Sequence, residues 1–198
     1  MENMFDILRD GLSAKGINPR SKASQDWLAQ KVAGLSGGIN RDNLMRNEPV
    51  FPTARPLPGR MYMFHYDPKT SATIEYYDAF PLVMLVDINS RGFEGLNLHY
   101  LPIDLRQKLF YSLLSDATNK SYDQNVYLKI TYDKLKSARK YKGFKPCYKK
   151  YLTNNVKGTM VNVPASEWEI AVHLPTASFN KASEAKVHSD SRKMVARF

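Results

Sequence analysis

Basic side chains crowd into one segment of this chain, from Lys129 to Lys157. These 29 residues hold ten lysines and arginines against a single acid, Asp133, which accounts for nearly all of the formal net charge of +10. Aromatic residues are spread through the same segment, at Tyr132, Tyr141, Phe144, Tyr148 and Tyr151. Charge concentrated in this way indicates a surface for a polyanion, and nucleic acid is the favoured partner. An acidic protein partner is the alternative.

The aromatic residues of the basic segment have two possible roles. Tyrosine rings stack on unpaired bases, but they also anchor a helix in a core while neighbouring lysines extend into solvent. We favour the second role for most of them. The sequence has no zinc finger, RRM signature or basic zipper, so any DNA binding is expected to be independent of base sequence.

Catalysis has little support in the sequence. The four histidines are scattered and show neither HExxH nor Cys/His ligand spacing. Five carboxylates in the first half could hold Mg²⁺, but no nuclease-like pattern follows a strand: Asp67, Glu75, Asp78, Asp87 and Glu94. Cys147, the sole cysteine, is more simply a buried small residue than a catalytic thiol. We therefore expect no catalytic residue, no metal site, no cofactor and no enzymatic activity.

The bulk composition is that of a globular protein. The 198 residues are 43% hydrophobic and 12% aromatic, enough for one domain with a substantial core. Residues 1–100 carry 11 basic and 11 acidic side chains, whereas residues 101–198 carry 18 and 8. With a single cysteine, no signal peptide and no apolar run long enough for a bilayer, we expect a soluble cytoplasmic product that does not bind a membrane.

The first 59 residues predict a helical arm and a linker. Residues 1–40 contain two short amphipathic helices, and Ser24 is a possible cap of the second. Residues 41–59 contain four prolines and predict an extended segment. The arm either docks on a neighbouring protein or packs on its own core. Its candidate partner-binding residues are Phe5, Leu8, Trp27 and Leu28.

The remainder predicts an α+β core over residues 60–182 and a C-terminal helix or tail over 183–198. Strands are expected at 61–66, 72–77, 81–86, 96–100, 127–130 and 159–163. Helices are expected after Pro102, over 132–140, from Pro146 to about Asn155, and over 167–174 after a Ser166/Glu169 capping box. The expected fold is a small antiparallel sheet or barrel-like core with inserted and appended helices.

Several blocks of the sequence resemble a known family. They are MYMFHYDPKT from Met61, YYDAFPLV from Tyr76, GFEGLNLHYLP from Gly92, FKPCYKKY from Phe144 and SDSRK from Ser189. Together they resemble the DNA end protector and head-completion proteins, virion components of large contractile-tailed bacteriophages. The resemblance covers about residues 60–195 and leaves out the N-terminal arm.

The resemblance implies a non-enzymatic virion protein, assembled in the host cytoplasm, that binds the terminus of the packaged genome and shields it from exonuclease. Charge alone then selects the candidate phosphate contacts: Lys134, Lys136, Arg139, Lys140, Lys142, Lys145, Lys149 and Lys150, with Arg192 and Lys193 as auxiliaries. The alternative is a structural neck, tail or baseplate component whose basic face and N-terminal arm bind neighbouring virion proteins.

Overall fold

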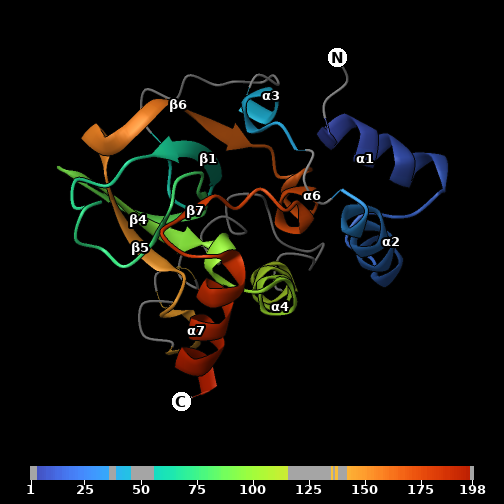
Figure 1. Cartoon of the computed structure of the whole chain (residues 1–198). Coiled ribbons are helices and arrows are strands. Elements are labelled where there is room, and N and C mark those ends of the chain that lie inside the picture. The colour runs from blue at the N-terminus through green and yellow to red at the C-terminus, as the bar shows by residue number, and fades with distance from the viewer. Residues whose placement is uncertain are drawn as a thin grey trace.

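A five-stranded antiparallel sheet forms the centre of the molecule (Figure 1). The structure, a computed structural model, describes residues 4–35, 39–45, 56–115, 135, 137 and 142–196. The strand order is β5-β4-β3-β1-β6. The strands are β1 (Met61–Tyr66), β3 (Leu82–Asn89), β4 (Gly92–Asn97), β5 (Tyr148–Leu152) and β6 (Val156–Val163). A second, two-stranded sheet pairs β2 (Tyr77–Asp78) with β7 (Phe179–Asn180).

Helices surround this sheet, which confirms the α+β class. They are α1 (Met4–Ala14), α2 (Lys22–Ala33), α3 (Arg41–Met45), α4 (Ile103–Ser115), α6 (Trp168–His173) and α7 (Glu184–Ala196), with short 3₁₀ turns η1 (Leu98–Tyr100), η4 (Lys142–Phe144) and η5 (Thr153–Asn155). α1, α2 and α4 all contact α6, which lies between the sheet and the two N-terminal helices (Figure 1). Within the described ranges, no helix combines the length and apolar character needed to cross a membrane.

Both faces of the sheet are buried because successive strand residues point to opposite sides. In β1, Met61 and Met63 join the main hydrophobic core beneath the helices. The intervening Tyr62 and Phe64, together with Tyr66, join a second cluster on the other face. Strand β1 is therefore apolar along its whole length, as expected for a strand between two packed layers.

The sheet is strongly curled. β5 and β6 are its two edges, yet only the three residues of η5 separate them in the chain. Three residues span at most about 10 Å, so the edges must meet at this end. Two hydrogen bonds tie the closure: the amide of Leu152 donates to the Tyr66 hydroxyl at 3.2 Å, and the amide of Asp67 donates to the Asn155 carbonyl at 3.1 Å. The second cluster fills the inside of the curl.

The N-terminal helices pack on the chain's own core. Phe5, Leu8 and Leu28 are buried in the main core, and Trp27 is partly buried against it. Of the two arrangements left open by the sequence, the structure has the packed-back one. Partner binding through these four residues stays a prediction.

The buried carboxylate of Glu169 connects these helices to the core. It accepts hydrogen bonds at 2.7 Å from the Arg20 amide, the Ser24 hydroxyl and the Tyr111 hydroxyl. The predicted capping box of Ser166 with Glu169 is therefore wrong, although the helix itself, α6, is confirmed. Ser21, rather than Ser24, caps α2, and Ser24 completes the capping box from inside the helix.

Three local predictions are wrong. Residues 41–45 of the expected linker form α3, whose Leu44 is buried and whose start is capped by the Asn40 side chain. The expected strand over 72–77 is mostly a turn, and β1 pairs instead with β3 and β6. The expected strand at 96–100 ends at Asn97 and continues as η1. The expected strand over 127–130 and most of the helix over 132–140 lie outside the described residues.

The largest correction concerns the basic segment. The helix expected from Pro146 is instead the edge strand β5, which pairs with β4 from Leu152↔Gly92 to Tyr148↔Leu96. The packing of Tyr151 favours a strand in this segment, because its ring stacks on that of Phe93 inside the curl, with 5.2 Å between the ring centres. Packing across the sheet outweighs the local helical pattern. Lys149 and Lys150 are therefore on a strand and do not share a helical face with Lys145.

Candidate nucleic-acid interface

A pocket of about 350 Å³ opens beside β5, at the C-terminal end of the basic segment. Its walls come from β5, from the turn that follows β1, and from the start of β2. It combines five tyrosines with three lysines, an unusual concentration of flat aromatic surface and positive charge: Tyr66, Tyr76, Tyr77, Tyr100, Tyr151, Lys69, Lys149 and Lys150. Tyr76 and Tyr77 are half-buried, whereas the other three tyrosines are nearly covered.

Lys149 is held against an aromatic wall of the pocket. Its amine lies 3.7 Å from the centre of the Tyr100 ring, a cation–π contact. Burial lowers the pKa of Lys149 to about 8, because the charged amine has lost much of its hydration. The result is a cation positioned by packing rather than a mobile surface lysine.

Lys150 has a different environment. Its amine pairs with Glu94, its neighbour across the β4–β5 ladder, at 3.2 Å. The same carboxylate accepts a hydrogen bond from the hydroxyl of Tyr148. Lys150 itself stays largely exposed, at 78% of its side chain. The pair therefore fixes the position of the charge without removing it from solvent.

Lys181 holds the turn after β1, which forms the outer wall of the pocket, by hydrogen bonds. The amine of Lys181 donates to the backbone carbonyls of Ser71, Ala72 and Ile74, the last two at 2.9 and 3.2 Å. One cation thus satisfies three carbonyls that would otherwise depend on water. The wall that carries Lys69 is consequently held in place.

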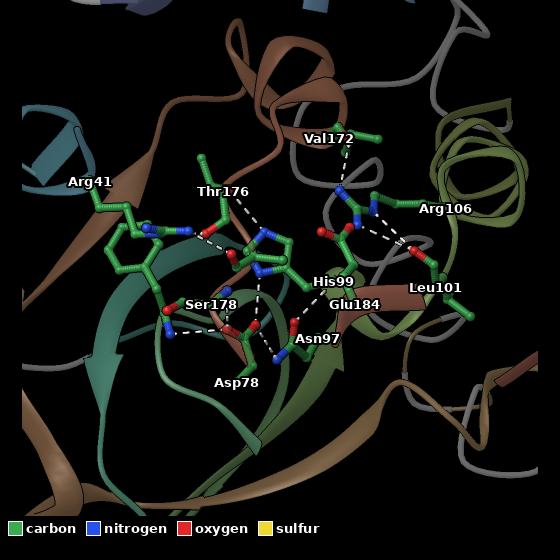
Figure 2. Close-up of polar contacts among 12 residues, drawn as sticks. Arg41, Asp78, Asn97, His99, Leu101, Arg106, Val172, Thr176, Ser178 and Glu184 are labelled. Atoms are coloured by element: carbon green, nitrogen blue, oxygen red, sulfur yellow. Dashed lines mark hydrogen bonds and ion pairs between the residues drawn. The ribbon is translucent and has the colours of Figure 1, made fainter. Parts of the chain in front are cut away.

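Behind the pocket lies a buried polar network centred on Asp78 and His99 (Figure 2). The Asp78 carboxylate accepts from His99 Nδ1 at 2.7 Å and from the Asn97 amide group at 3.1 Å. It also accepts from the backbone amides of Phe80 at 3.0 Å and Ser178 at 3.1 Å. Burial on its own would raise the pKa of Asp78, but the His99 and Asn97 contacts outweigh it and lower the pKa. Asp78 is therefore ionised.

His99 is neutral in this network. Burial lowers its pKa despite the neighbouring carboxylate. With Nδ1–H donating to Asp78, Nε2 accepts from the Thr176 hydroxyl at 2.9 Å. An Asp-His-Thr connection of this kind also occurs in nucleophilic triads. Here Asp78, His99 and Thr176 are 3%, 0% and 1% exposed, so the hydroxyl lies beneath the surface. We interpret the network as structural, joining η1 to the segment between α6 and β7.

Two arginines brace this network from opposite sides (Figure 2). Arg41 of α3 donates to the carbonyls of Thr176 at 2.8 Å and Ala177 at 2.6 Å. Arg106 of α4 is fully buried and donates to the carbonyls of Leu101 and Val172, at 3.3 Å each. Burial lowers the pKa of Arg106 to about 10, so this buried guanidinium is still charged near neutral pH.

We expect the protein to lose stability on mild acidification. Burial lowers the pKa of three histidines, His99, His173 and His188. The unfolded chain then takes up protons below its ordinary histidine pKa of about 6.5 while the folded chain does not. The stability that depends on these three neutral histidines is therefore fully present above about pH 6.5 and is lost as the pH falls below it. Urea unfolding should show a lower midpoint at pH 5 than at pH 7, and equal midpoints would contradict this prediction.

The predicted phosphate contacts are only partly within the described residues. Lys134, Lys136, Arg139 and Lys140 lie outside them, as does the side chain of Lys142. Lys145 is exposed, and Lys149 and Lys150 line the pocket. Arg192 is paired with Asp104 by two contacts, at 2.6 and 3.1 Å, and Lys193 lies 4.0 Å from Asp190. The structure thus brings Lys149 and Lys150 to one site, with Arg192 and Lys193 on α7.

Sequence reasoning missed the other pocket residues. Lys69, Tyr76, Tyr77 and Tyr100 were assigned only to strands and a turn. The pair of Tyr76 and Tyr77 directly before Asp78 is the one local signal, since tyrosines are enriched at binding surfaces. Cys147, by contrast, is buried as predicted, and burial raises the pKa of its thiol to about 12. Among the described residues, no group of three or more His, Cys, Asp or Glu could hold a metal ion.

A lysine- and tyrosine-lined pocket at the end of a strongly basic segment is the kind of surface expected of a polyanion-binding protein. The chain matches the family described as Phage T4 terminal DNA protecting protein over residues 3–196, and it belongs to that family. It is therefore a bacteriophage protein of a family that protects DNA termini. The match includes the N-terminal helices, which the resemblance read from the sequence left out. No curated protein and no solved structure matches the chain.

Proposed function

We propose that this protein binds the end of the packaged genome through sequence-independent contacts to backbone phosphates and shields it from exonuclease. The observation that carries the proposal is the family match over residues 3–196, together with a basic segment that leads directly into β5. Phosphate contacts require only positive charge within reach, which this segment supplies at high density. Shielding is then steric, and needs no catalytic group.

The ten candidate contacts are not equivalent. Arg192, Lys193 and Lys150 each have a carboxylate partner at the surface. Exposed pairs of this kind contribute only about 0–1 kcal/mol, so a phosphate can replace or join the carboxylate. Lys149, which lines the pocket, and the other basic residues of 134–145 are our primary contacts, because the charge of the chain is concentrated there. Arg192 and Lys193 are auxiliary.

In the particle, we place the protein in the neck or tail, at the end of the genome. In the alternative, the basic face and the N-terminal helices bind neighbouring virion proteins. The two roles predict a different effect of salt on the affinity of the protein for free DNA. Several phosphate contacts require that affinity fall steeply between low and moderate salt.

We expect the purified protein to slow exonuclease digestion of linear duplex DNA. A variant with Lys136→Glu, Lys140→Glu and Lys145→Glu should lose this protection, because it reverses three charges of the basic segment. A matched variant with Lys15→Glu, Lys22→Glu and Lys31→Glu has the same net charge but alters the exposed surface near α1 and α2. It should protect as well as the unaltered protein.

The measurement is the rate at which label is released from end-labelled DNA. An unchanged rate with the unaltered protein would refute end protection. No binding to random duplex at low salt would favour the structural role in the neck or tail. Equal loss of protection in both triple variants would show that net charge alone, and not the basic segment, is responsible.

A further inference from the structure

We propose that the tyrosine- and lysine-lined pocket beside β5 binds the terminal nucleotide of a DNA strand, unpaired from its complement, and so distinguishes an end from the interior of a duplex. This inference rests on the proposed function and adds to it the means of end recognition. Backbone contacts alone cannot supply that recognition, because the phosphates near an end resemble those in the interior.

The size of the pocket selects a single nucleotide. Its volume of about 350 Å³ lies within the range of small-ligand sites, roughly 300–1,000 Å³. A duplex cannot enter a cavity of this size, but one extruded nucleotide can. The terminal pair has a stacking neighbour on one side only, so opening it costs less than extruding a base from the interior.

The tyrosines supply the surface for a base. Tyr76 and Tyr77 are half-buried, so part of each side chain remains accessible at the pocket. Stacking on tyrosine is tolerant of sequence, because every base has an aromatic face. This tolerance matches a site that must accept whatever nucleotide terminates the strand.

The lysines supply the countercharge for the nucleotide's phosphates. Lys69 lies on the turn and Lys149 lies on β5, so positive charge reaches the pocket from two walls. Lys150 also lines the pocket, but its amine pairs with Glu94, which does not. Lys149 is already partly stripped of water over the Tyr100 ring. Little further desolvation is needed when a phosphate approaches it. Among the described residues that line the pocket, the only carboxylate is that of Asp78, which is 3% exposed and accepts four hydrogen bonds.

The pocket is formed before DNA arrives. Lys181 secures the turn that carries Lys69, the β4–β5 ladder secures Lys149, and the Asp78–His99 network lies directly behind. A site that need not be ordered on binding loses less entropy when it is filled. This rigidity favours a binding role for the pocket over an accidental gap between elements.

The test compares a closed DNA minicircle with the same DNA linearised, at moderate salt, where interior phosphate contacts are weakened. We expect the full-length protein to bind the linear form at least about tenfold more tightly, as stacking of one base allows. A double variant, Tyr76→Ala with Lys149→Ala, should bind both forms alike, within about twofold. Tyr76→Phe, which keeps the ring, should retain the preference.

A second measurement uses pH. Lys149 binds phosphate as an ammonium ion, so the preference for linear DNA should decline between about pH 7 and pH 9 and stay constant in Lys149→Arg. Two buried neighbours of Lys149 do not titrate in this range, because burial raises the pKa of Cys147 to about 12 and raises that of Tyr100. Asp78 is ionised throughout, since its pKa is lowered.

Lys108→Ala on α4, an exposed lysine outside the pocket, is the control for loss of one charge and should keep the preference. Equal binding of both DNA forms by the unaltered protein would overturn the pocket inference while leaving DNA binding intact. A preserved preference in the double variant, with a normal unfolding midpoint, would also overturn it. Binding to neither form would instead refute the proposed function.

Discussion

Replacing Asp78 with alanine should lower the free energy of unfolding by about 3–5 kcal/mol, the usual cost of removing one partner of a buried ionic network. The substitution leaves His99 Nδ1, the Asn97 side-chain amide and two backbone amides without their acceptor. Each orphaned buried donor retains its desolvation cost without compensation. Chemical denaturation at pH 7 measures the loss.

Two control variants test whether the loss of stability in Asp78→Ala comes from the buried network. Asp26→Ala removes an exposed carboxylate whose partner Lys22 is also exposed, and should cost less than about 0.5 kcal/mol. Asp78→Asn keeps the shape of the side chain but brings amide hydrogens toward groups that are themselves donors, so it should be less stable than the unaltered protein. A loss at Asp78→Ala as small as that at Asp26→Ala would show that the network does not hold the fold together.

Replacing Gly92 with alanine should disrupt the attachment of β5, at a cost of about 3 kcal/mol or more. A Cβ at this position would overlap the backbone carbonyl of Tyr151 and lie 3.0 Å from the Cα of Leu152. Backbone atoms in a paired strand cannot move aside as a flexible side chain can. β5 must therefore shift, and with it Lys149 and Lys150, so loss of stability and loss of end preference should occur together.

The matched control for Gly92 is Gly143→Ala. Gly143 lies in η4 with an ordinary φ, and an added Cβ would meet nothing within 4 Å. It should leave the unfolding midpoint unchanged or slightly raised, because alanine restricts the unfolded chain. If Gly92→Ala also left the unfolding midpoint unchanged, β4 and β5 would not approach each other at this point as closely as the structure shows.

The sequence was informative where a pattern is local. The aromatic content of residues 61–66 located β1, and the apolar stripe after Pro102 located α4. The charge of residues 129–157 pointed to a segment whose described part includes Lys149 and Lys150 at the pocket. The strand β5 was missed because its residues become a strand through partners more than 50 residues earlier in the chain, such as Phe93 for Tyr151. Local spacing cannot report such a partner.

The pocket and the network behind it could not be predicted for the same reason. Asp78 and His99 are 21 residues apart in the sequence, and Thr176 follows His99 by 77 residues. Taken alone, Asp78 suggests a turn residue, His99 a histidine in a strand and Thr176 a hydroxyl in a loop. The tyrosines that line the pocket come from β1, the β2 region, η1 and β5. Only the curl of the sheet assembles them. The prediction that the segment's own tyrosines serve mainly as core anchors is confirmed for Tyr151, which is 5% exposed within the second cluster.

The three-residue link between the two edges of the sheet also has a consequence for biosynthesis. Both edges, β5 and β6, come late in the chain, and β6 pairs with β1 about 100 residues earlier, at Met61↔Val163. Pairings this distant in sequence form slowly and only after the distant partner exists. A nascent chain that has not passed residue 163 lacks a complete sheet, a curl and a pocket. Ribosomal stalling or premature termination before that point would therefore yield an aggregation-prone product with unpaired strands.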